Sequence, residues 1–419
     1  MNVKVTTLES GLRVATHDMP QLETAAVGVW VDVGARAERP QVNGISHMLE
    51  HMAFKGTRRR SALQIAEEIE RVGGHLNAYT SREQTAYYAR VLKDDLALAV
   101  DMLADILQNS IFEKTELARE RDVIIQEIGE ANDTPDDIVF DRLQEAAFPE
   151  QPMGRSILGT VERVRGFDRA ALACYMTDQY RAPGMVLVAA GRVDHGRLVD
   201  LAETAFSGLA TGPRGTCEAA RYVGGEGNEP RDLEQVHLTL GFNGVAFKDP
   251  DFYALQLFTT VLGGGMSSRL FQEVRERRGL AYSVYAFASS YTDSGLFGIY
   301  AGTGPDQIGE LIPVISGEMT RMTADVEEVE VARARAQLKA GLMMSLESST
   351  ARAEQIARQL LVFGRVIPIA ELVACVDAVD TATVRRIGER MLAAGRPTLA
   401  AVGPIGALEP HDRIASRFH

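Results

Sequence analysis

The chain has 419 residues, of which 46% are hydrophobic and 24% are charged, and its formal net charge is −13 at pH 7. This composition excludes a disordered protein, and the negative charge argues against nucleic acid or an anionic membrane as the main partner. The sequence contains no apolar run long enough to span a bilayer, and its beginning lacks the apolar core of a signal peptide. We therefore expect a cytoplasmic protein of about two domains with no membrane insertion.

The first half of the chain alternates between strand-like and helix-like patterns. Strands are indicated where small or apolar side chains recur at every second residue, and helices where they recur at every third or fourth. A pair of glycines, Gly73 and Gly74, ends the first helical pattern. The pattern predicts a strand, a helix, two strands and two helices, in this order: 24–33, 63–72, 75–79, 85–92, 96–108 and 115–131.

The second half repeats this order of patterns. The predicted strands and helices there cover 237–242, 252–262, 268–277, 280–289, 295–301, 326–348 and 350–361. The fragments 69–79 and 274–284 occupy equivalent places in the two halves. We therefore predict an α+β fold of two similar domains that arose by internal duplication, each with a mainly antiparallel sheet packed with helices.

A segment rich in glycine, proline and charge separates the two halves. It runs from Thr211 to Glu234 and shows no periodicity, which is typical of a linker. The predicted organisation is an N-terminal metal-binding domain, a linker and a similar C-terminal domain, with the ranges 1–212, 213–234 and 235–419.

One short motif, H-x-x-E-H, carries the first indication of chemistry. His47 and His51 lie four residues apart, so on a helix their imidazoles point within about 40° of each other and can reach one metal ion. Glu50 lies beside them, in the place of a general base toward water. This residue order is the inverzincin signature of zinc peptidases. The alternative is a surface helix that carries the three residues by chance.

A third metal ligand is required, and the helical pattern 115–131 offers two. Glu120 and Glu127 lie seven residues apart and therefore point to the same side of that helix. Either could complete the site while the other orients a ligand from behind. Both could instead be solvated charges beside Arg119 and Arg121, so the residues alone leave this choice open.

Four segments resemble the pitrilysin-type zinc peptidases, in particular the single-repeat branch that contains the mitochondrial processing peptidase beta subunit and its bacterial relatives. These segments are HMLEHMAFKGT (47–57), ERVGGHLNAYTSREQTAYYARVL (70–92), ERDVIIQEI (120–128) and LGGGMSSRLFQEVRERRGLAYSVYAF (262–287). The resemblance implies one zinc ion per chain, held by His47, His51 and Glu127. It also implies that Glu50 is the catalytic base and that Glu120 supports the catalytic site.

The resemblance also implies a set of substrate-binding residues. Arg275 and Tyr282 match a pair that binds the substrate backbone, and the tyrosine assists the tetrahedral intermediate. Phe54 matches a position that lines the pocket for the side chain after the cut. An extended peptide would add to the edge strand formed by Asn77, Ala78 and Tyr79. Taken alone, Arg275 is one arginine among several, Tyr282 could be an ordinary strand residue and Phe54 could be core.

These expectations define one function and one rival. The function is a zinc-dependent metalloendopeptidase that cleaves peptides or precursor polypeptides bound in extended form within a dimeric chamber. The expected partner is a second copy of the chain, which would supply Arg275 and Tyr282 to a composite active site. The rival is a noncatalytic scaffold or partner subunit of a heteromeric processing complex. An intact set of metal and catalytic residues argues against that rival.

Overall fold

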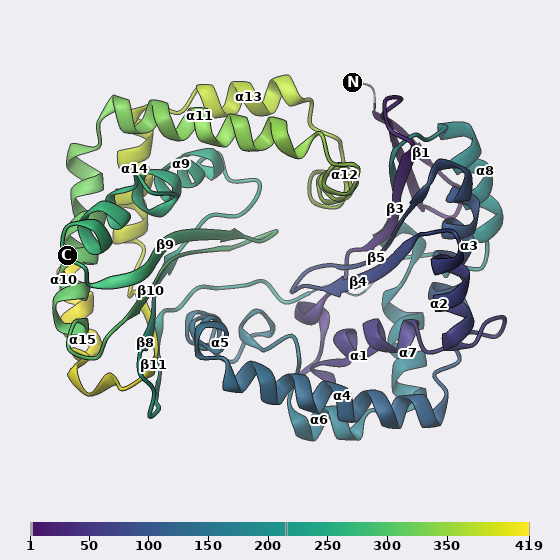
Figure 1. Ribbon diagram of the computed structural model, residues 1–419, viewed down its shortest axis with the longest axis horizontal. Coiled ribbons are helices and arrows are strands. Elements are labelled where there is room, and N and C mark those ends of the chain that lie inside the picture. Colours follow the sequence, from purple (N-terminus) through teal and green to yellow (C-terminus); the bar gives the residue numbers. More distant parts are fainter. Residues whose placement is uncertain (1–2, 214, 216, 419) are drawn as a thin grey trace. The chain divides into compact units, whose positions relative to one another are not determined.

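The structure, a computed structural model, describes residues 3–213, 215 and 217–418. The chain forms two compact units, and each unit is built around one β-sheet (Figure 1). Neither unit is one continuous stretch of chain. The first unit comprises Met1–Ile128, Ser156–Glu218 and Met343–Ile367, and the second comprises Gly129–Arg155, Ala219–Leu342 and Pro368–His419.

The sheet of the first unit has six strands in the order β1-β2-β6-β3-β5-β4. All neighbours are antiparallel except β2 and β6, which are parallel. The central strands are buried on both faces, and β4 lies at one edge. The strands are β1 (Val3–Thr7), β2 (Arg13–Asp18), β3 (Thr24–Val31), β4 (His75–Thr80), β5 (Thr85–Leu92) and β6 (Met185–Gly191).

The sheet of the second unit has five strands in the order β7-β11-β8-β10-β9. Here β7 and β11 form the one parallel pair, and the other neighbours are antiparallel. The strands are β7 (Gly225–Pro230), β8 (Val236–Asn243), β9 (Ala281–Ser290), β10 (Gly295–Thr303) and β11 (Thr398–Gly403).

The two sheets share one topology. If β2 to β6 are matched in chain order with β7 to β11, the spatial order 2-6-3-5-4 becomes 7-11-8-10-9, which is the order observed. The single parallel pair also falls at the same place in both sheets. The predicted α+β fold of two similar, mainly antiparallel halves is confirmed, with β1 as an addition to the first sheet.

Helices cover both faces of the first sheet. One face packs against α1, α2, α3 and α8, and this packing forms the main core of the unit. The opposite face is covered by α12 (Figure 1). The helices of the first unit include α1 (Ile45–Ala53), α2 (Ala62–Arg71), α3 (Leu96–Gln108), α6 (Val161–Gly166), α7 (Arg169–Gln179), α8 (His195–Ala205) and α12 (Ser349–Phe363).

The second unit is layered in the same way. Its sheet packs on one face against α9 and α14, with α10 behind them, and on the other face against α5. Its helices include α5 (Pro135–Ala147), α9 (Phe252–Gly263), η6 (a π-helix, Phe271–Glu276), α10 (Ile308–Asp325), α13 (Ile369–Asp377), α14 (Thr381–Ala393) and α15 (His411–Ala415). Two long helices, α4 (Lys114–Asp133) and α11 (Glu328–Ser345), contain boundaries between the units.

The two halves of the sequence exchange one helix each. The helix α5 belongs to the first half of the chain but packs on β7, β8 and β11 of the second sheet. The helix α12 belongs to the second half but packs on β2, β3 and β6 of the first sheet. The sequence pattern assigned α12 to the C-terminal domain, and the structure corrects that assignment. An amphipathic pattern shows that a helix has a buried face but not which sheet receives it.

Local signals explain where several elements begin and end. The helix α2 starts with a reciprocal capping box, because the Ser61 hydroxyl accepts from the Gln64 N–H and the Gln64 side chain accepts from the Ser61 N–H. The same helix stops before Gly73, which has a positive φ of 67° that favours glycine. The glycine stop predicted from the sequence is therefore present.

The predicted linker differs from the structure in one respect. Its range contains β7, which pairs in parallel with β11 at the edge of the second sheet. The sequence of β7, GEGNEP, has no strand-like alternation because none of its residues is fully buried. Arg214 and Thr216 of that range lie outside the described residues.

Within the described part of the chain, no helix is both long enough and apolar enough to cross a membrane.

Candidate metal centre

The helix α1 carries the H-x-x-E-H motif on the face that points away from the core. Its other face is buried and contributes Met48, Leu49 and Met52 to the main core of the first unit. The apolar residues therefore fix the rotation of the helix, while His47, Glu50 and His51 remain only partly buried. The motif is helical, as its spacing requires.

Two histidines and one glutamate converge on a single point. The Oε2 atom of Glu127 lies 3.6 Å from Nε2 of His47 and 3.5 Å from Nε2 of His51. Ligand atoms bound at about 2.1 Å in tetrahedral geometry are about 3.4 Å apart, so these spacings fit zinc. Within the described part of the chain, no other group of three His, Cys, Asp or Glu side chains converges in this way.

Glu120 lies at the Nδ1 side of the His51 ring, whereas Glu127 lies at the Nε2 side. Its Oε2 atom is 3.0 Å from Nδ1 of His51, and its Oε1 atom is 2.6 Å from Nζ of Lys55. A proton on Nδ1 that is donated to Glu120 leaves the Nε2 lone pair of His51 free to face Glu127 and a metal ion. Of the two glutamates that the sequence left open, Glu127 has the geometry of a ligand and Glu120 that of a supporting carboxylate.

Burial shifts the pKa of His47, which belongs to the cluster, and of Glu50, which lies beside it. Burial, with a smaller contribution from His51, lowers the pKa of the His47 imidazole to about 4. His47 is therefore neutral near pH 7, the form that binds a metal ion. Burial raises the pKa of the Glu50 carboxyl, and hydrogen bonding from Thr80 partly opposes that rise. A carboxylate with a raised pKa is a better proton acceptor, which suits a general base.

The predicted substrate residues of the first unit lie next to α1. Phe54 is the residue that follows the helix, and its half-buried ring lies 6.4 Å from the ring of Tyr87. Asn77, Ala78 and Tyr79 lie on β4, which pairs only with β5 and is therefore an edge of the sheet. The structure thus brings these residues to the places that a peptide-binding edge requires, and their roles remain predictions.

The predicted residues of the second unit form a group of their own. Arg275 lies in η6, and its guanidinium is 4.8 Å from the ring centres of both Phe271 and Tyr282. Tyr282 is the second residue of β9 and is 79% exposed. A guanidinium between two aromatic faces is held by cation–π attraction and leaves the tyrosine hydroxyl open to a ligand.

Sequence reasoning missed two polar neighbours of this site. Lys55 pairs with Glu120 and lies just beyond the end of α1, so helical spacing from His51 does not indicate it. Thr80, which faces Glu50, ends the edge strand β4 and had no signal in the sequence. Each contacts a carboxylate beside the cluster, Lys55 that of Glu120 and Thr80 that of Glu50.

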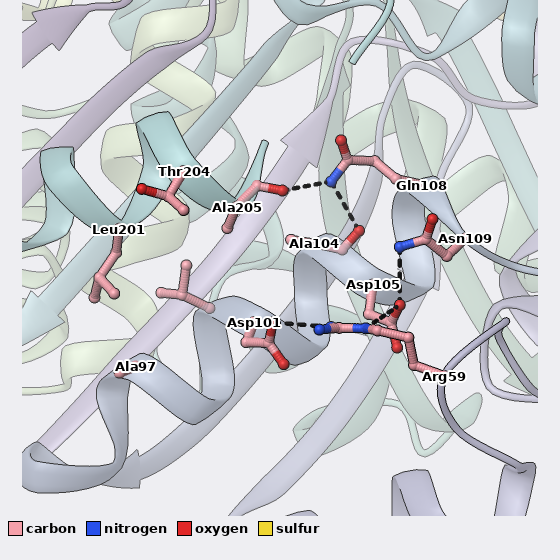
Figure 2. A pocket seen from close by; sticks show the side chains of 11 residues that line it. Arg59, Ala97, Asp101, Ala104, Asp105, Gln108, Asn109, Leu201, Thr204 and Ala205 are labelled. Atoms are coloured by element: carbon pink, nitrogen blue, oxygen red, sulfur yellow. Dashed lines mark hydrogen bonds and ion pairs between the residues drawn. The ribbon is translucent and has the colours of Figure 1, made fainter. Parts of the chain in front are cut away.

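The first unit also has a hollow of about 370 Å³ between α3 and α8 (Figure 2). Its charged groups already pair with one another, since Arg59 contacts both Asp101 and Asp105 at 2.8 and 3.0 Å. The amides of Gln108 and Asn109 are likewise hydrogen-bonded to protein groups. None of the predicted site residues lines this hollow, so the metal cluster is the stronger candidate site.

Comparison with known protein families matches both halves of the chain. Residues 13–161 match the family described as Insulinase (Peptidase family M16), and residues 166–338 match the Peptidase M16 inactive domain. The chain is 40% identical to a protein of Rickettsia felis named as an uncharacterized zinc protease, over 96% of this chain and 98% of that protein. It is 41% identical to the human mitochondrial-processing peptidase subunit beta, over 99% of this chain and 87% of the human protein.

Solved structures share the fold. A protease from Helicobacter pylori superposes with a TM-score of 0.89 at 21% identity and covers 96% of this chain and 99% of its own. A chain of complex III2 from Candida albicans gives a TM-score of 0.88 at 24% identity, with both chains fully covered. At these identities the likeness establishes the architecture of two similar halves.

Proposed function

The chain belongs to peptidase family M16, and from this premise we propose that it is a zinc-dependent metalloendopeptidase that cleaves extended peptides. The observation that carries the proposal is the cluster of His47, His51 and Glu127, whose spacing fits tetrahedral zinc. Relatives named as zinc protease and as processing peptidase beta subunit support the same activity. We assign one zinc ion per chain to this cluster.

The ion would add Lewis-acid activation of the scissile carbonyl and of water at its open position. The remaining chemistry belongs to side chains. Glu50 takes the proton of the attacking water and returns it to the leaving amine. Its position beside the cluster, together with its raised pKa, supports this role. Glu120 keeps His51 in the tautomer that presents Nε2 to the metal.

We assign substrate binding to β4 and Phe54 of one copy of the chain and to Arg275 and Tyr282 of a second copy. A peptide that adds to β4 would pair with the backbone of Asn77, Ala78 and Tyr79, and its side chain after the cut would meet Phe54. Because main-chain hydrogen bonds dominate this mode, we expect broad sequence specificity. The Tyr282 hydroxyl donates a hydrogen bond to the oxyanion of the tetrahedral intermediate, and Arg275 holds the peptide backbone.

The substitution Glu50→Gln tests the proposed reaction. It removes the base but none of the ligands, so turnover of a fluorogenic peptide should fall by several orders of magnitude while bound zinc stays near one per chain. The exposed Glu67 of α2 provides a matched control, and Glu67→Gln should leave both quantities unchanged. Near-normal turnover by Glu50→Gln would assign the base to another residue.

We further propose that two copies of the chain enclose a chamber with composite sites. The resemblance described above extends to fused family members, in which two such chains are joined end to end. It supports this arrangement, because in those proteins the matching arginine and tyrosine belong to the second of the joined chains and serve the metal of the first. Each site would combine His47, His51 and Glu127 of one subunit with the Arg275 and Tyr282 pair of its partner. A two-fold dimer then has two equivalent sites.

Mixing two inactive variants tests the composite site. Glu50→Gln and Tyr282→Phe homodimers should each be nearly inactive. After subunit exchange, about half of the dimers are mixed and each mixed dimer has one intact site, so activity should recover to roughly a quarter of wild type. If mass spectrometry confirms exchange but no activity returns, the site is built within one chain.

The same measurements address the rival function. A noncatalytic scaffold would show no peptidase activity in any preparation, including one loaded with zinc. An enzyme that requires a different partner chain would gain activity only when that chain is added. The intact cluster and its buried supporting carboxylate argue for the enzyme, since a scaffold has no use for either.

A further inference from the structure

The helix α1 begins without a side-chain cap of its own. Its N-cap residue is Gly44, which has a φ of 95° and offers no side chain to the free N–H groups of the first turn. Any side chain at this position would meet the carbonyl oxygen of Leu158, since a Cβ would lie 2.7 Å from it. The N–H groups of the first turn therefore need an acceptor from outside the helix. This turn begins at Gly44, three residues before His47.

Glu38 supplies that acceptor from outside the helix. Its Oε2 atom accepts hydrogen bonds from the Gly44 N–H at 2.7 Å and from the Asn43 side-chain amide at 2.9 Å. Its Oε1 atom accepts from the Ser46 N–H at 2.8 Å. The side chain is buried, with 2% of Glu38 exposed. Burial raises the pKa of the Glu38 carboxyl, and the hydrogen bonds from Ser46, Asn43 and Gly44 partly oppose that rise. The positive end of α1 also favours the ionised form.

The hydrogen bonds at the start of α1 continue to groups on both sides of the helix. The hydroxyl of Ser46 hydrogen-bonds to the hydroxyl of Tyr175 in α7 at 2.9 Å. The Thr80 hydroxyl contacts the Ser46 carbonyl oxygen at 3.5 Å and also faces Glu50. Ser46 is thus the point at which Glu38, α7 and the edge strand β4 meet, directly before His47.

We propose that Glu38 is a positioning residue for the metal centre, which sets the location of α1 and thereby of His47, Glu50 and His51 against Glu127. The inference rests on the proposed zinc function of that cluster. Metal sites tolerate displacements of only about 0.5 Å, and α1 has nine residues over which a shift of its first turn would be transmitted. The Glu38 hydrogen bonds described above go to Asn43, Gly44 and Ser46, which lie before the first metal ligand in the chain.

The variant Glu38→Gln tests the proposal with little change in volume. A glutamine presents one oxygen and one NH₂ group, yet both Glu38 oxygens face N–H donors, so one donor must meet another donor in either orientation. We expect zinc affinity, measured by competition with a chromophoric chelator, to fall by roughly 10- to 100-fold. At saturating zinc, kcat for a peptide should fall while KM stays within about two-fold.

A second helix of the same unit provides the matched control. Asp194 caps α8 by accepting from the Arg197 N–H at 2.8 Å, and α8 carries no residue of the metal cluster. Asp194→Ala should lower Tm but leave zinc affinity within about two-fold of wild type. If Glu38→Gln loses a comparable amount of Tm and also keeps wild-type zinc affinity, Glu38 is merely structural and the proposal is wrong.

Two further measurements keep the test decisive. If Glu38→Gln does not fold, Glu38→Asp retains both acceptor oxygens on a shorter stem and should show a smaller loss of zinc affinity of the same kind. Amide hydrogen exchange of residues 44–48 should accelerate in either variant, with or without metal. A wild-type chain that binds no zinc would refute the proposed function, whereas unchanged exchange at α1 would refute the anchoring role of Glu38.

Discussion

The two units use one strand order for different purposes. In the first unit, the connection after β3 contains α1, with His47, Glu50 and His51 on its outer face. In the second unit, the connection after β8 contains α9, whose sequence FYALQLFTTVLG has no histidine or carboxylate and is mostly buried. The shared topology shows that the duplicated scaffold does not determine chemistry. A few side chains on α1 and α4 distinguish the unit that has the cluster of His47, His51 and Glu127 from its counterpart.

The two exchanged helices, α12 and α5, also differ in some of the contacts that they make with their sheets. Against the first sheet, α12 makes polar contacts, because Arg352 donates to Nδ1 of His17 at 3.0 Å and Arg13 donates to the Leu360 carbonyl. Against the second sheet, α5 makes aromatic ones, with the ring of Phe140 stacked 5.6 Å from that of Tyr300. Both helices bury apolar side chains against their sheets, and α5 also pairs Arg142 with Glu229 of β7, so only the individual polar and aromatic contacts differ.

The largest expected effect separates the two glutamates of α4. Glu127→Gln removes a metal ligand and should leave the purified chain without zinc. Glu120→Gln removes only a supporting carboxylate and should weaken zinc affinity by roughly 10- to 100-fold. Metal analysis after dialysis measures both, with the exposed Glu130→Gln as the control on the same helix. Zinc retained by Glu127→Gln but lost by Glu120→Gln would reverse the assignment.

The second unit should contribute to turnover without binding metal. Tyr282→Phe keeps the ring that Arg275 contacts but removes the hydroxyl, so kcat should fall by roughly 100- to 1,000-fold at unchanged zinc content. Tyr285→Phe alters a partly exposed tyrosine on the same strand and should have little effect. Steady-state kinetics on one peptide substrate compares the variants. Equal losses in both would mean that the strand is merely perturbed.

Some features of the structure are predictable from the sequence because they depend only on nearby residues. Alternating or helical patterns follow local burial, so β5 and α3 match their predicted ranges at both ends. The pair His47 and His51 was identifiable because its four-residue spacing is a property of one helix. The residue pattern could not decide whether Glu120 or Glu127 is the third ligand, because both point to the same side of their helix. Only the position of α1 distinguishes them.

Features that depend on distant parts of the chain were not predictable in this way. The strand β7 has no alternating pattern because none of its residues is fully buried, and its partner β11 lies far from it in the sequence. The exchange of α5 and α12 leaves no local trace, since each helix has a buried face whichever sheet it covers. Glu38 lies in a loop, and its role depends on the fold that brings it to the start of α1.

A matched pair of core substitutions tests which sheet each of the exchanged helices, α5 and α12, covers. Leu143 of α5 and Ile356 of α12 are both fully buried, so truncation of either to alanine should cost about 2 to 5 kcal/mol of unfolding free energy. Hydrogen exchange distinguishes their locations. Leu143→Ala should accelerate exchange in the second sheet and Ile356→Ala in the first. The opposite result would mean that each helix belongs to the unit of its own half.

The smallest expected effect is a pH dependence of stability that arises at the contact between α12 and the first sheet. Burial, followed by the charge of Arg352, lowers the pKa of His17 below its usual 6.5. Neutral His17 accepts the hydrogen bond from Arg352, so the folded state resists a proton that the unfolded chain takes up readily. This contribution to stability is therefore fully present above about pH 6.5 and is lost as the pH falls toward the folded pKa.

The variant His17→Gln isolates this effect, because glutamine offers Arg352 an acceptor that does not titrate. Its Tm should fall less than that of wild type between about pH 7.5 and pH 5.5. The exposed His75 of β4 is the control, and His75→Gln should retain the pH dependence of wild type. An identical pH dependence in His17→Gln and wild type would show that the contact between α12 and its sheet does not respond to protonation.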